Sequence, residues 1–393
     1  MNKKIIAIAA LALALGSCKK DDEYLPPDWN YDIPETAAPS NLNLGAYYTN
    51  RTDPEWSGTA ADDYQAKIHD TPWLNRDGDG TPRAYVYNTS GVLRQQCEWA
   101  DRAGLDFFIF DYNNSANDMN LILTYSDARA QDPACRVRMA FNYSFSHLSL
   151  NATDPDDESV ANPDERKKLT DHGVSFNKIV DEFKALWAEY FSKDYYHRLQ
   201  DERPLIIFPA KIASPATVDY ALFMPAFRQA MADYTTQLQA SDPSVSNNAL
   251  NFYYIGDVAD NWMPPQRNES ASRWMDGSSD KLWYPSRYYE RWYAFYAYTD
   301  MAWQNWRDYA AGWGNDFVPT IFPEYYVTSS GTRPIERTPE NYRDFCNVAK
   351  RNAGRAGVIL INSWNEYETR SALEPADRYG ETYLELTRQY FNR

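Results

Sequence analysis

Three short stretches decide the fold: residues 105–110 read LDFFIF, residues 205–208 read LIIF and residues 358–361 read VILI. Each stretch is apolar almost throughout and does not alternate between apolar and polar positions. Strands that are buried on both faces have this composition, and they belong to parallel sheets covered by helices. The three stretches therefore predict buried strands of an α/β protein.

Other short apolar runs continue this series along the chain, with amphipathic segments between them. The predicted strands are 44–49, 105–112, 137–144, 204–210, 252–258, 293–298, 318–323 and 357–364. The sixth lies in an aromatic run that could equally be helical. The predicted helices, with apolar residues at helical spacing, are 91–103, 176–199, 215–238, 300–311, 339–353 and 379–391. Eight alternating units favour a (β/α)8 TIM barrel with loop insertions, one of them the polar stretch 148–176.

The first 41 residues differ from this pattern. Residues 1–17 combine two lysines, a short apolar run and small residues before Cys18, as a bacterial lipoprotein signal does. The apolar run is too short to span a bilayer. We expect Cys18 to be lipidated, residues 18–41 to form a polar tether, and residues 42–393 to form one domain. The predicted location is the cell envelope, in the periplasm or on the outer-membrane surface, with the lipid as the contact with the membrane.

Composition excludes several classes of partner and cofactor. The formal net charge of −16 argues against nucleic acid, because binding phosphates needs clustered Lys and Arg. The four histidines lack the spacing of metal ligands, and no nucleotide-binding glycine motif occurs, so we expect no metal and no cofactor. Residues 75–80 resemble the start of a calcium loop, but Val86 stands where its last ligand would be, which favours a polar turn. We expect a monomer, and we interpret Cys97 as a buried structural thiol.

Polar and aromatic residues follow the predicted strands, at the barrel end where enzymes of this fold carry their active sites. The residues in these positions are Tyr47, Tyr48, Asp111, Tyr112, Asn142, Asp257, Glu324, Trp364, Asn365 and Glu366. Aromatic rings make up 16% of the sequence and can cover the apolar faces of sugars. Carboxylates beside aromatic rings indicate a carbohydrate site.

The C-terminal segment INSWNEYETRSALEPADRYGETYLELTRQYF, residues 361–391, resembles the signature of glycoside hydrolase family 99-like proteins, including the WbsX-type group. The stretches LGAYYT (44–49), QQCEWADRAGLDFFIFDY (95–112) and YYHRLQDERPLIIFP (195–209) are also similar. FVPTIFPEYYVTSSGTR (317–333), followed by TPENYRDF (338–345), agrees more loosely. The resemblance covers nearly all of residues 42–393.

This resemblance implies a retaining, endo-acting hydrolase of α-linked glycans such as mannan. In the family pattern the first Glu of NEWxE assists attack by the substrate's own 2-hydroxyl, and the second Glu is the general acid/base. Glu366 matches the first position, and Glu374 matches the Glu of a Leu-Glu-Pro segment. Thr369 stands where the second Glu is expected, and it cannot donate the proton.

Three hypotheses follow from this departure. The first is a glycoside hydrolase in which Glu366 assists attack and Glu368 donates the proton, with Glu324 or Asp257 as alternative donors. The second is a glycan-binding surface lipoprotein that has lost hydrolysis. The third, a glycosyltransferase, fits least well, because its nucleotide-sugar donors are cytoplasmic. In each hypothesis the partner is an oligo- or polysaccharide.

Overall fold

The computed structural model describes residues 31–50, 70, 72–74, 89–132, 134–148, 176–210, 220–258, 269–282, 295–326 and 335–392. The predicted signal peptide, Cys18, the turn at 75–80 and most of the predicted insertion lie outside the described residues. Among the helices that are described, none is both long and apolar enough to cross a membrane.

Nine parallel strand segments form one sheet in the order β7-β6-β5-β4-β3-β2-β1-β9-β8. Their bounds are β1 (Asn43–Tyr48), β2 (Phe107–Tyr112), β3 (Arg138–Tyr143), β4 (Leu205–Pro209), β5 (Tyr253–Asp257), β6 (Gly277–Ser279), β7 (Asp316–Val318), β8 (Thr320–Ile321) and β9 (Val358–Ile361). The apolar runs of β2, β4 and β9 are buried, as their sequences predict.

The two ends of this order, β7 and β8, are consecutive in the chain and are separated by Pro319 alone. β7 pairs with β6 and β8 pairs with β9, while Leu360 N donates a hydrogen bond of 2.9 Å to Pro319 O. Proline has no N–H for the ladder, so it divides one strand into two segments. Taken as one strand, β7 and β8 close the sheet into an eight-stranded barrel. The predicted (β/α)8 fold is confirmed.

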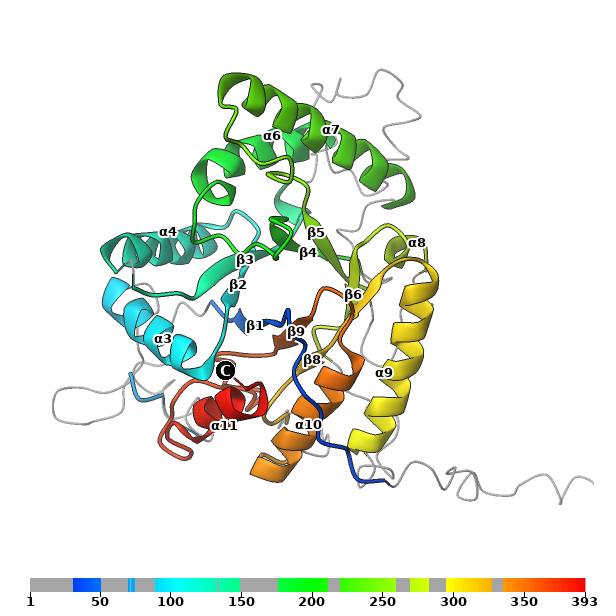
Figure 1. Ribbon diagram of the computed structural model, residues 1–393. Helices are drawn as coiled ribbons and strands as arrows, with labels where there is room; N and C mark the ends of the chain where they lie inside the picture. Colours follow the sequence, from blue (N-terminus) through cyan, green and yellow to red (C-terminus); the bar gives the residue numbers. More distant parts are fainter. Residues whose placement is uncertain are drawn as a thin grey trace, which may run out of the picture.

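Helices surround the barrel (Figure 1). The longer ones are α3 (Ser90–Ala103), α4 (Ala116–Gln131), α6 (Phe176–Leu186), α7 (Tyr220–Ser241), α9 (Phe295–Gly312), α10 (Pro339–Asn352) and α11 (Thr382–Tyr390). Short turns of helix occupy Ser146–Leu148 (η3), Trp187–Phe191 (η4) and Glu269–Ser272 (α8). α10 begins where predicted, because Thr338 accepts a hydrogen bond from Asn341 N and Pro339 occupies the first turn. α4 is not among the helices that the sequence predicts.

The predicted sixth strand, 293–298, is wrong. α9 begins at Phe295, and further along it Thr299, Trp303, Trp306 and Ala310 are buried at intervals of three or four residues, which is helical spacing. The sixth strand is instead β6, whose sequence Gly-Ser-Ser has no apolar run. The other seven predicted strands each overlap an observed strand.

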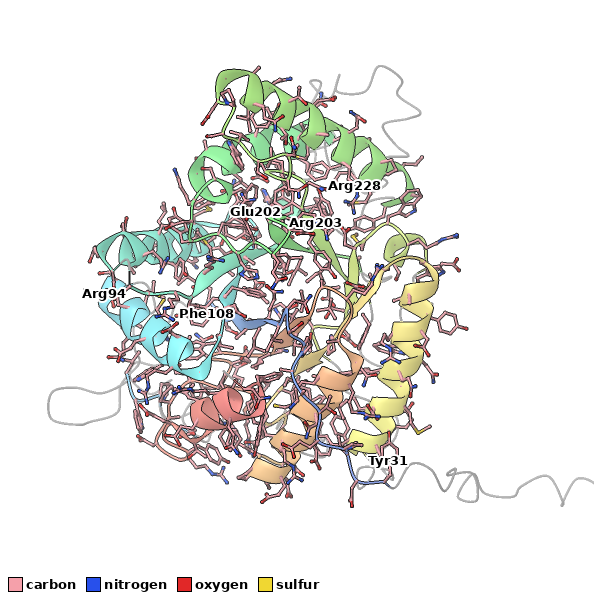
Figure 2. The ribbon with its side chains drawn as sticks, in the orientation of Figure 1. Tyr31, Arg94, Phe108, Glu202, Arg203 and Arg228 are labelled. Atoms are coloured by element: carbon pink, nitrogen blue, oxygen red, sulfur yellow. The ribbon has the colours of Figure 1, made fainter. Side chains whose placement is uncertain are left out.

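β6 is held by charged neighbours. Asp276, the residue before β6, accepts bonds of 3.0 Å from Arg203 and 2.8 Å from Arg228, which lie near each other in Figure 2. Its carboxylate also accepts a bond from Tyr254 N at 3.1 Å. The ion pairs thus fix the start of a strand that has little apolar side-chain area of its own.

Alternation along each strand divides the core into two layers. The interior of the barrel contains Tyr47, Phe107, Ile109, Ile207, Ile255 and Leu360, among others. The residues between them face outward and pack against the helices, as Phe108 does from β2 (Figure 2). This alternation decides which residues at a strand's end face the centre of the barrel.

Residues 31–42, here called the strap, lie across the outside of α9 and α10 (Figure 1). Tyr31 Oη donates a hydrogen bond of 2.7 Å to Asp300 Oδ2 in α9. Thr36 N donates one of 3.2 Å to Asn347 Oδ1 in α10. Nearly half of the predicted tether, residues 31–41, therefore lies against the barrel.

Candidate active site at the C-terminal end of the barrel

Four of the predicted site residues meet at the C-terminal end of the barrel interior. Tyr47 belongs to the interior layer, and Asp111, Asn142 and Asp257 follow interior residues of β2, β3 and β5 by two positions. Asn142 Nδ2 donates a hydrogen bond of 2.7 Å to Asp111 Oδ1. We call this region, with Lys281, the barrel mouth.

Lys281 connects the strands around the mouth. Its Nζ lies 4.7 Å from the centre of the Tyr47 ring and 3.9 Å from Asp111 Oδ1. Its backbone N donates to Asp257 Oδ1 at 3.1 Å, and its carbonyl accepts from Asn362 Nδ2 at 2.9 Å. Lys281, which lies two residues after the end of β6, therefore contacts residues of β1, β2 and β5 and the residue that follows β9.

The Tyr47 hydroxyl is buried and has no hydrogen-bond partner among the described residues. Burial raises the pKa of Tyr47, and the charges of Asp257, Asp111 and Asp280 raise it further. The phenol therefore stays protonated at neutral pH and can donate a hydrogen bond.

Glu366 lies on the segment that follows β9, and its carboxylate is half-buried. Glu366 N donates to Ser363 Oγ at 2.7 Å, which fixes the backbone. Oε1 accepts from Glu368 N at 3.2 Å, and Oε2 accepts from Thr49 Oγ1 at 3.4 Å. These contacts hold the Glu366 carboxylate beside the end of β1, where Tyr47 also lies. Burial raises the pKa of Tyr325, and the negative charge of the neighbouring Glu366 raises it further.

Glu368 and Thr369, two and three residues after Glu366, differ in exposure. The Glu368 side chain is exposed. Thr369 is half-buried: Oγ1 lies 2.9 Å from Ser371 Oγ, and its carbonyl accepts from Tyr326 N at 2.9 Å. A side chain held within its own loop in this way serves to shape the loop.

Glu324 lies apart from the mouth contacts, in an ionic cluster. Its side chain is 8% exposed and lies 3.3 Å from Arg337 Nε and 3.6 Å from Arg370 Nη1. Burial raises the pKa of Glu324, against the opposing effect of both arginines. The hollow beside it holds about 10 Å³, room for at most one water molecule.

Several predicted site residues face outward and support the site from behind. Tyr48 Oη donates to Gln96 Oε1 at 2.7 Å, and Gln96 Nε2 donates to Glu374 Oε1 at 2.8 Å. Gln96 thereby joins α3 to β1 and to the C-terminal segment. Asn365 Oδ1 accepts from Thr49 N at 2.8 Å, which ties the Glu366 segment to β1.

Trp364 and Tyr112 also face outward. Trp364 is fully buried, with its ring 5.2 Å from that of Phe108. Tyr112 Oη donates to Glu182 Oε1 of α6 at 3.3 Å. Both side chains are part of the packing between the barrel and its helices.

Lys281, Asp280 and Tyr325 were not among the predicted site residues. The first two follow β6, which was placed at the wrong position. The signal that could have found them is the pair Asp280-Lys281 directly after a short run of small residues. Among the described residues, no group of three or more His, Cys, Asp or Glu is placed to hold a metal ion.

No protein-family model and no curated protein matches the chain. Solved structures do match. A glycoside hydrolase-like protein shares 18% identity with a TM-score of 0.69, over 92% of this chain and 97% of that one. The GH99 endo-alpha-mannosidase from Bacteroides thetaiotaomicron shares 15% identity with a TM-score of 0.54, over 89% of this chain and 96% of that one. The resemblance to family 99-like proteins is thus confirmed at the level of the fold.

Proposed function

We propose that the chain is a glycoside hydrolase with its active site at the barrel mouth. The observation that carries the proposal is the position of Glu366. Its half-buried carboxylate is oriented by Thr49 and by the backbone of Glu368, at the barrel end where enzymes of this fold do their chemistry. A carboxylate fixed by its neighbours is suited to assisting attack at a sugar carbon.

Hydrolysis of a glycoside also needs a proton donor for the leaving oxygen. In our proposal Glu368 donates this proton, because it is an exposed carboxylic group two residues from Glu366. Glu324 is the weaker candidate, since its carboxylate is paired with two arginines in a closed cluster.

The proposed substrate is an α-linked, mannan-like glycan that is cleaved with retention of the anomeric configuration. The resemblance of residues 361–391 and the similarity in fold to an endo-alpha-mannosidase support this substrate class. The mouth offers suitable contacts: the Asp111 carboxylate and the Lys281 ammonium group, whose side chains are 44% and 34% exposed, can bind sugar hydroxyls.

A hydrolysis screen on residues 19–393 tests the proposal, with α-mannans among the glycans. Wild type should release products, and Glu366→Gln should lose at least about a thousandfold in kcat/KM, because the charge that assists attack is gone. Glu340→Gln, an exposed change on α10, is the matched control and should keep full activity. NMR of the first products formed reports the anomeric configuration.

A second candidate, glycan binding without hydrolysis, is favoured by Thr369. The residue that stands where the family pattern has its acid/base is engaged with Ser371 and Tyr326. Under this function neither wild type nor Glu366→Gln releases products, yet both bind the same glycan on an array.

We also propose that the chain is a lipoprotein of the cell envelope, anchored through Cys18. The order of charged, apolar and small residues before Cys18 supports this. Labelled fatty acid should enter the wild type in a bacterial host and should not enter Cys18→Ser. Incorporation into both proteins would disprove the anchor at Cys18.

A further inference from the structure

A hollow of about 730 Å³ lies at the N-terminal ends of β1 to β4, the end of the barrel opposite to the barrel mouth. Its lining comes from the residues that precede β2, β3 and β4 and from the last turns of α3 and α11, which lie side by side (Figure 1). We call it the basal hollow. Its volume is in the range of small-molecule sites in proteins, and the proposed glycoside hydrolase makes no use of it.

Positive charge predominates in the lining, although the formal net charge of the whole chain is −16. The charged residues are Arg102, Arg136, Arg138, Arg198, Arg388, Asp101 and Asp106. Arg102 forms an ion pair with Glu381, at the start of α11. Burial lowers the pKa of His197 to about 3, so this ring, which also lines the hollow, is uncharged at neutral pH. Five positive charges and three negative charges, Glu381 included, leave the hollow with +2.

Two of these arginines have no partner in the part of the chain that the structure describes. Arg136 and Arg138 are exposed, and their side chains form no ion pair and no hydrogen bond with any described residue. Val137, between them, is buried in the layer outside the barrel, so the two guanidinium groups start from the other face of the strand. Ala140, two residues after Arg138, belongs to the barrel interior. The start of β3 thus directs both charges toward the base of the barrel.

Arg198 is oriented by backbone carbonyls. Its Nη1 donates a hydrogen bond of 2.8 Å to Glu202 O, and its Nη2 donates one to Phe191 O. No described carboxylate forms an ion pair with it. The carbonyls therefore hold the guanidinium group in place without neutralising its charge.

A neighbouring hollow of about 380 Å³ provides a comparison, because it shares Asn43, Leu199 and Gln200 with the basal hollow. Both of its arginines are paired with carboxylates. Arg203 lies 2.7 Å from Asp201, and Arg355 lies 2.8 Å from Asp316. Arginines without a carboxylate partner are therefore particular to the basal hollow of the two.

We propose that the basal hollow binds the phosphate group of a small phosphate monoester, such as a sugar phosphate. The arginines without carboxylate partners carry this inference, because guanidinium groups bind phosphate oxygens through two parallel hydrogen bonds. A phosphate monoester carries a charge of about −1.5 to −2 at neutral pH, which balances the +2 of the lining. The volume also leaves room for the organic part of the ester. The inference does not depend on the proposed function.

Calorimetric titration of residues 19–393 in a buffer without phosphate tests the proposal. The probes are glucose 6-phosphate, inorganic phosphate and uncharged glucose. Glucose 6-phosphate should bind at one site per chain, inorganic phosphate should bind there more weakly, and glucose should not compete for the site. Equal affinities for the first two probes would identify free phosphate as the ligand and overturn the ester.

Two single substitutions test the position of the site. Arg138→Gln and Arg136→Gln should each lower the affinity for glucose 6-phosphate tenfold or more, as the loss of a charged hydrogen bond does. Arg94→Gln, an exposed change of the same charge on α3, is the control and should bind as the wild type does (Figure 2). Without ligand, all three variants should melt within about 2 °C of the wild type.

Two results would overturn the basal hollow as a phosphate site. One is the absence of heat from both phosphate probes in the wild type. The other is an affinity for glucose 6-phosphate that Arg136→Gln and Arg138→Gln leave unchanged relative to Arg94→Gln, because the phosphate would then bind elsewhere on the molecule.

Discussion

Lys281 brings a positive charge between an aromatic ring and a carboxylate at the barrel mouth. Its ammonium group contacts the face of Tyr47 and approaches Asp111, and its backbone atoms hold Asp257 and Asn362. The side chain is 34% exposed, so it is within reach of a ligand. Its role in binding can be separated from the role of its backbone, because a substitution changes only the side chain.

Replacing Lys281 by Met keeps an unbranched side chain that is one heavy atom shorter and removes its charge and donors. We expect kcat/KM on the glycan identified by the screen to fall roughly tenfold to a hundredfold, as is typical for the loss of a charged hydrogen bond. Lys193→Met, at an exposed position on another part of the barrel, is the control. Equal kinetics for the two variants would exclude Lys281 from substrate binding.

At this scale the sequence predicts which residues lie at strand ends, but not which way they face. Tyr47 and Tyr48 are adjacent and chemically identical, yet one lines the interior and the other bonds to Gln96 outside it. A shift of one residue exchanges the two faces of a strand. In a strand buried on both sides, no polar alternation reveals the register, so Tyr112 and Trp364 were also assigned to the wrong face.

At the scale of elements, the packing of β1 against β2 depends on Gly45. A Cβ atom at this position would lie 2.3 Å from Cε2 and Cζ of Phe107 inside the barrel. The two residues are register partners on neighbouring strands. The Phe107 ring therefore occupies the space that a side chain at position 45 would need.

Gly45→Ala should lower the free energy of unfolding by about 1–3 kcal/mol, because the ring or the strand must move. Gly91→Ala in α3 is the matched control: no heavy atom lies within 4 Å of its Cβ, so it should be neutral or slightly stabilising. Urea unfolding of both variants measures the difference. A Gly45→Ala protein as stable as the control would show that the barrel accommodates the methyl group freely.

β6 shows why one element escaped prediction. Its residues carry no apolar signal, and the strand is positioned by Asp276 with Arg203 and Arg228, which come from distant parts of the sequence. Local pattern cannot reveal such long-range pairing. The aromatic run at 293–298 offered a stronger local signal, but its residues belong to α9 where described.

Asp276→Asn should cost about 1–3 kcal/mol of unfolding free energy, since two partly buried guanidinium groups lose their shared carboxylate. It should also lower kcat/KM, because Lys281 follows β6. Asp308→Asn, which breaks an exposed pair with Arg307, should change stability by less than about 0.5 kcal/mol. Unfolding and kinetic measurements that agree for the two variants would contradict this role of Asp276.

On the scale of the whole molecule, the fold class follows from the alternation of buried strands and amphipathic helices. The stability of the molecule in acid depends on a buried histidine at the end of the barrel opposite to the barrel mouth. His197 is 2% exposed, stacks on Phe107 at 4.1 Å and shares a hydrogen bond of 3.1 Å with Asn43 Oδ1. Burial, with the nearby charge of Arg138, lowers the pKa of His197 from 6.5 to about 3.

Between pH 6.5 and 3 the unfolded chain therefore binds a proton at His197 that the folded chain does not. Stability falls as the pH drops through this window, by about 1.4 kcal/mol per pH unit from this group, and levels off below the folded pKa. His197→Gln should be less stable at pH 7 but lose roughly 2–3 kcal/mol less than wild type between pH 6.5 and 4.5. Parallel pH profiles of unfolding free energy for both proteins would show that His197 titrates normally.

The contact of Tyr31 with α9 shortens the segment that would connect the barrel to a lipid anchor at Cys18. With the lipid on Cys18, as we propose, the segment between the anchor and the first described contact with the barrel ends at Tyr31 and not at the start of β1. Thirteen residues extend to roughly 45 Å, whereas a chain free up to residue 42 would reach roughly 80 Å. The connecting segment would also meet the barrel at its side, on α9. With this anchor, the contact of Tyr31 with α9 would lie within roughly 45 Å of the bilayer, and this distance limits how far from the membrane the barrel mouth can act.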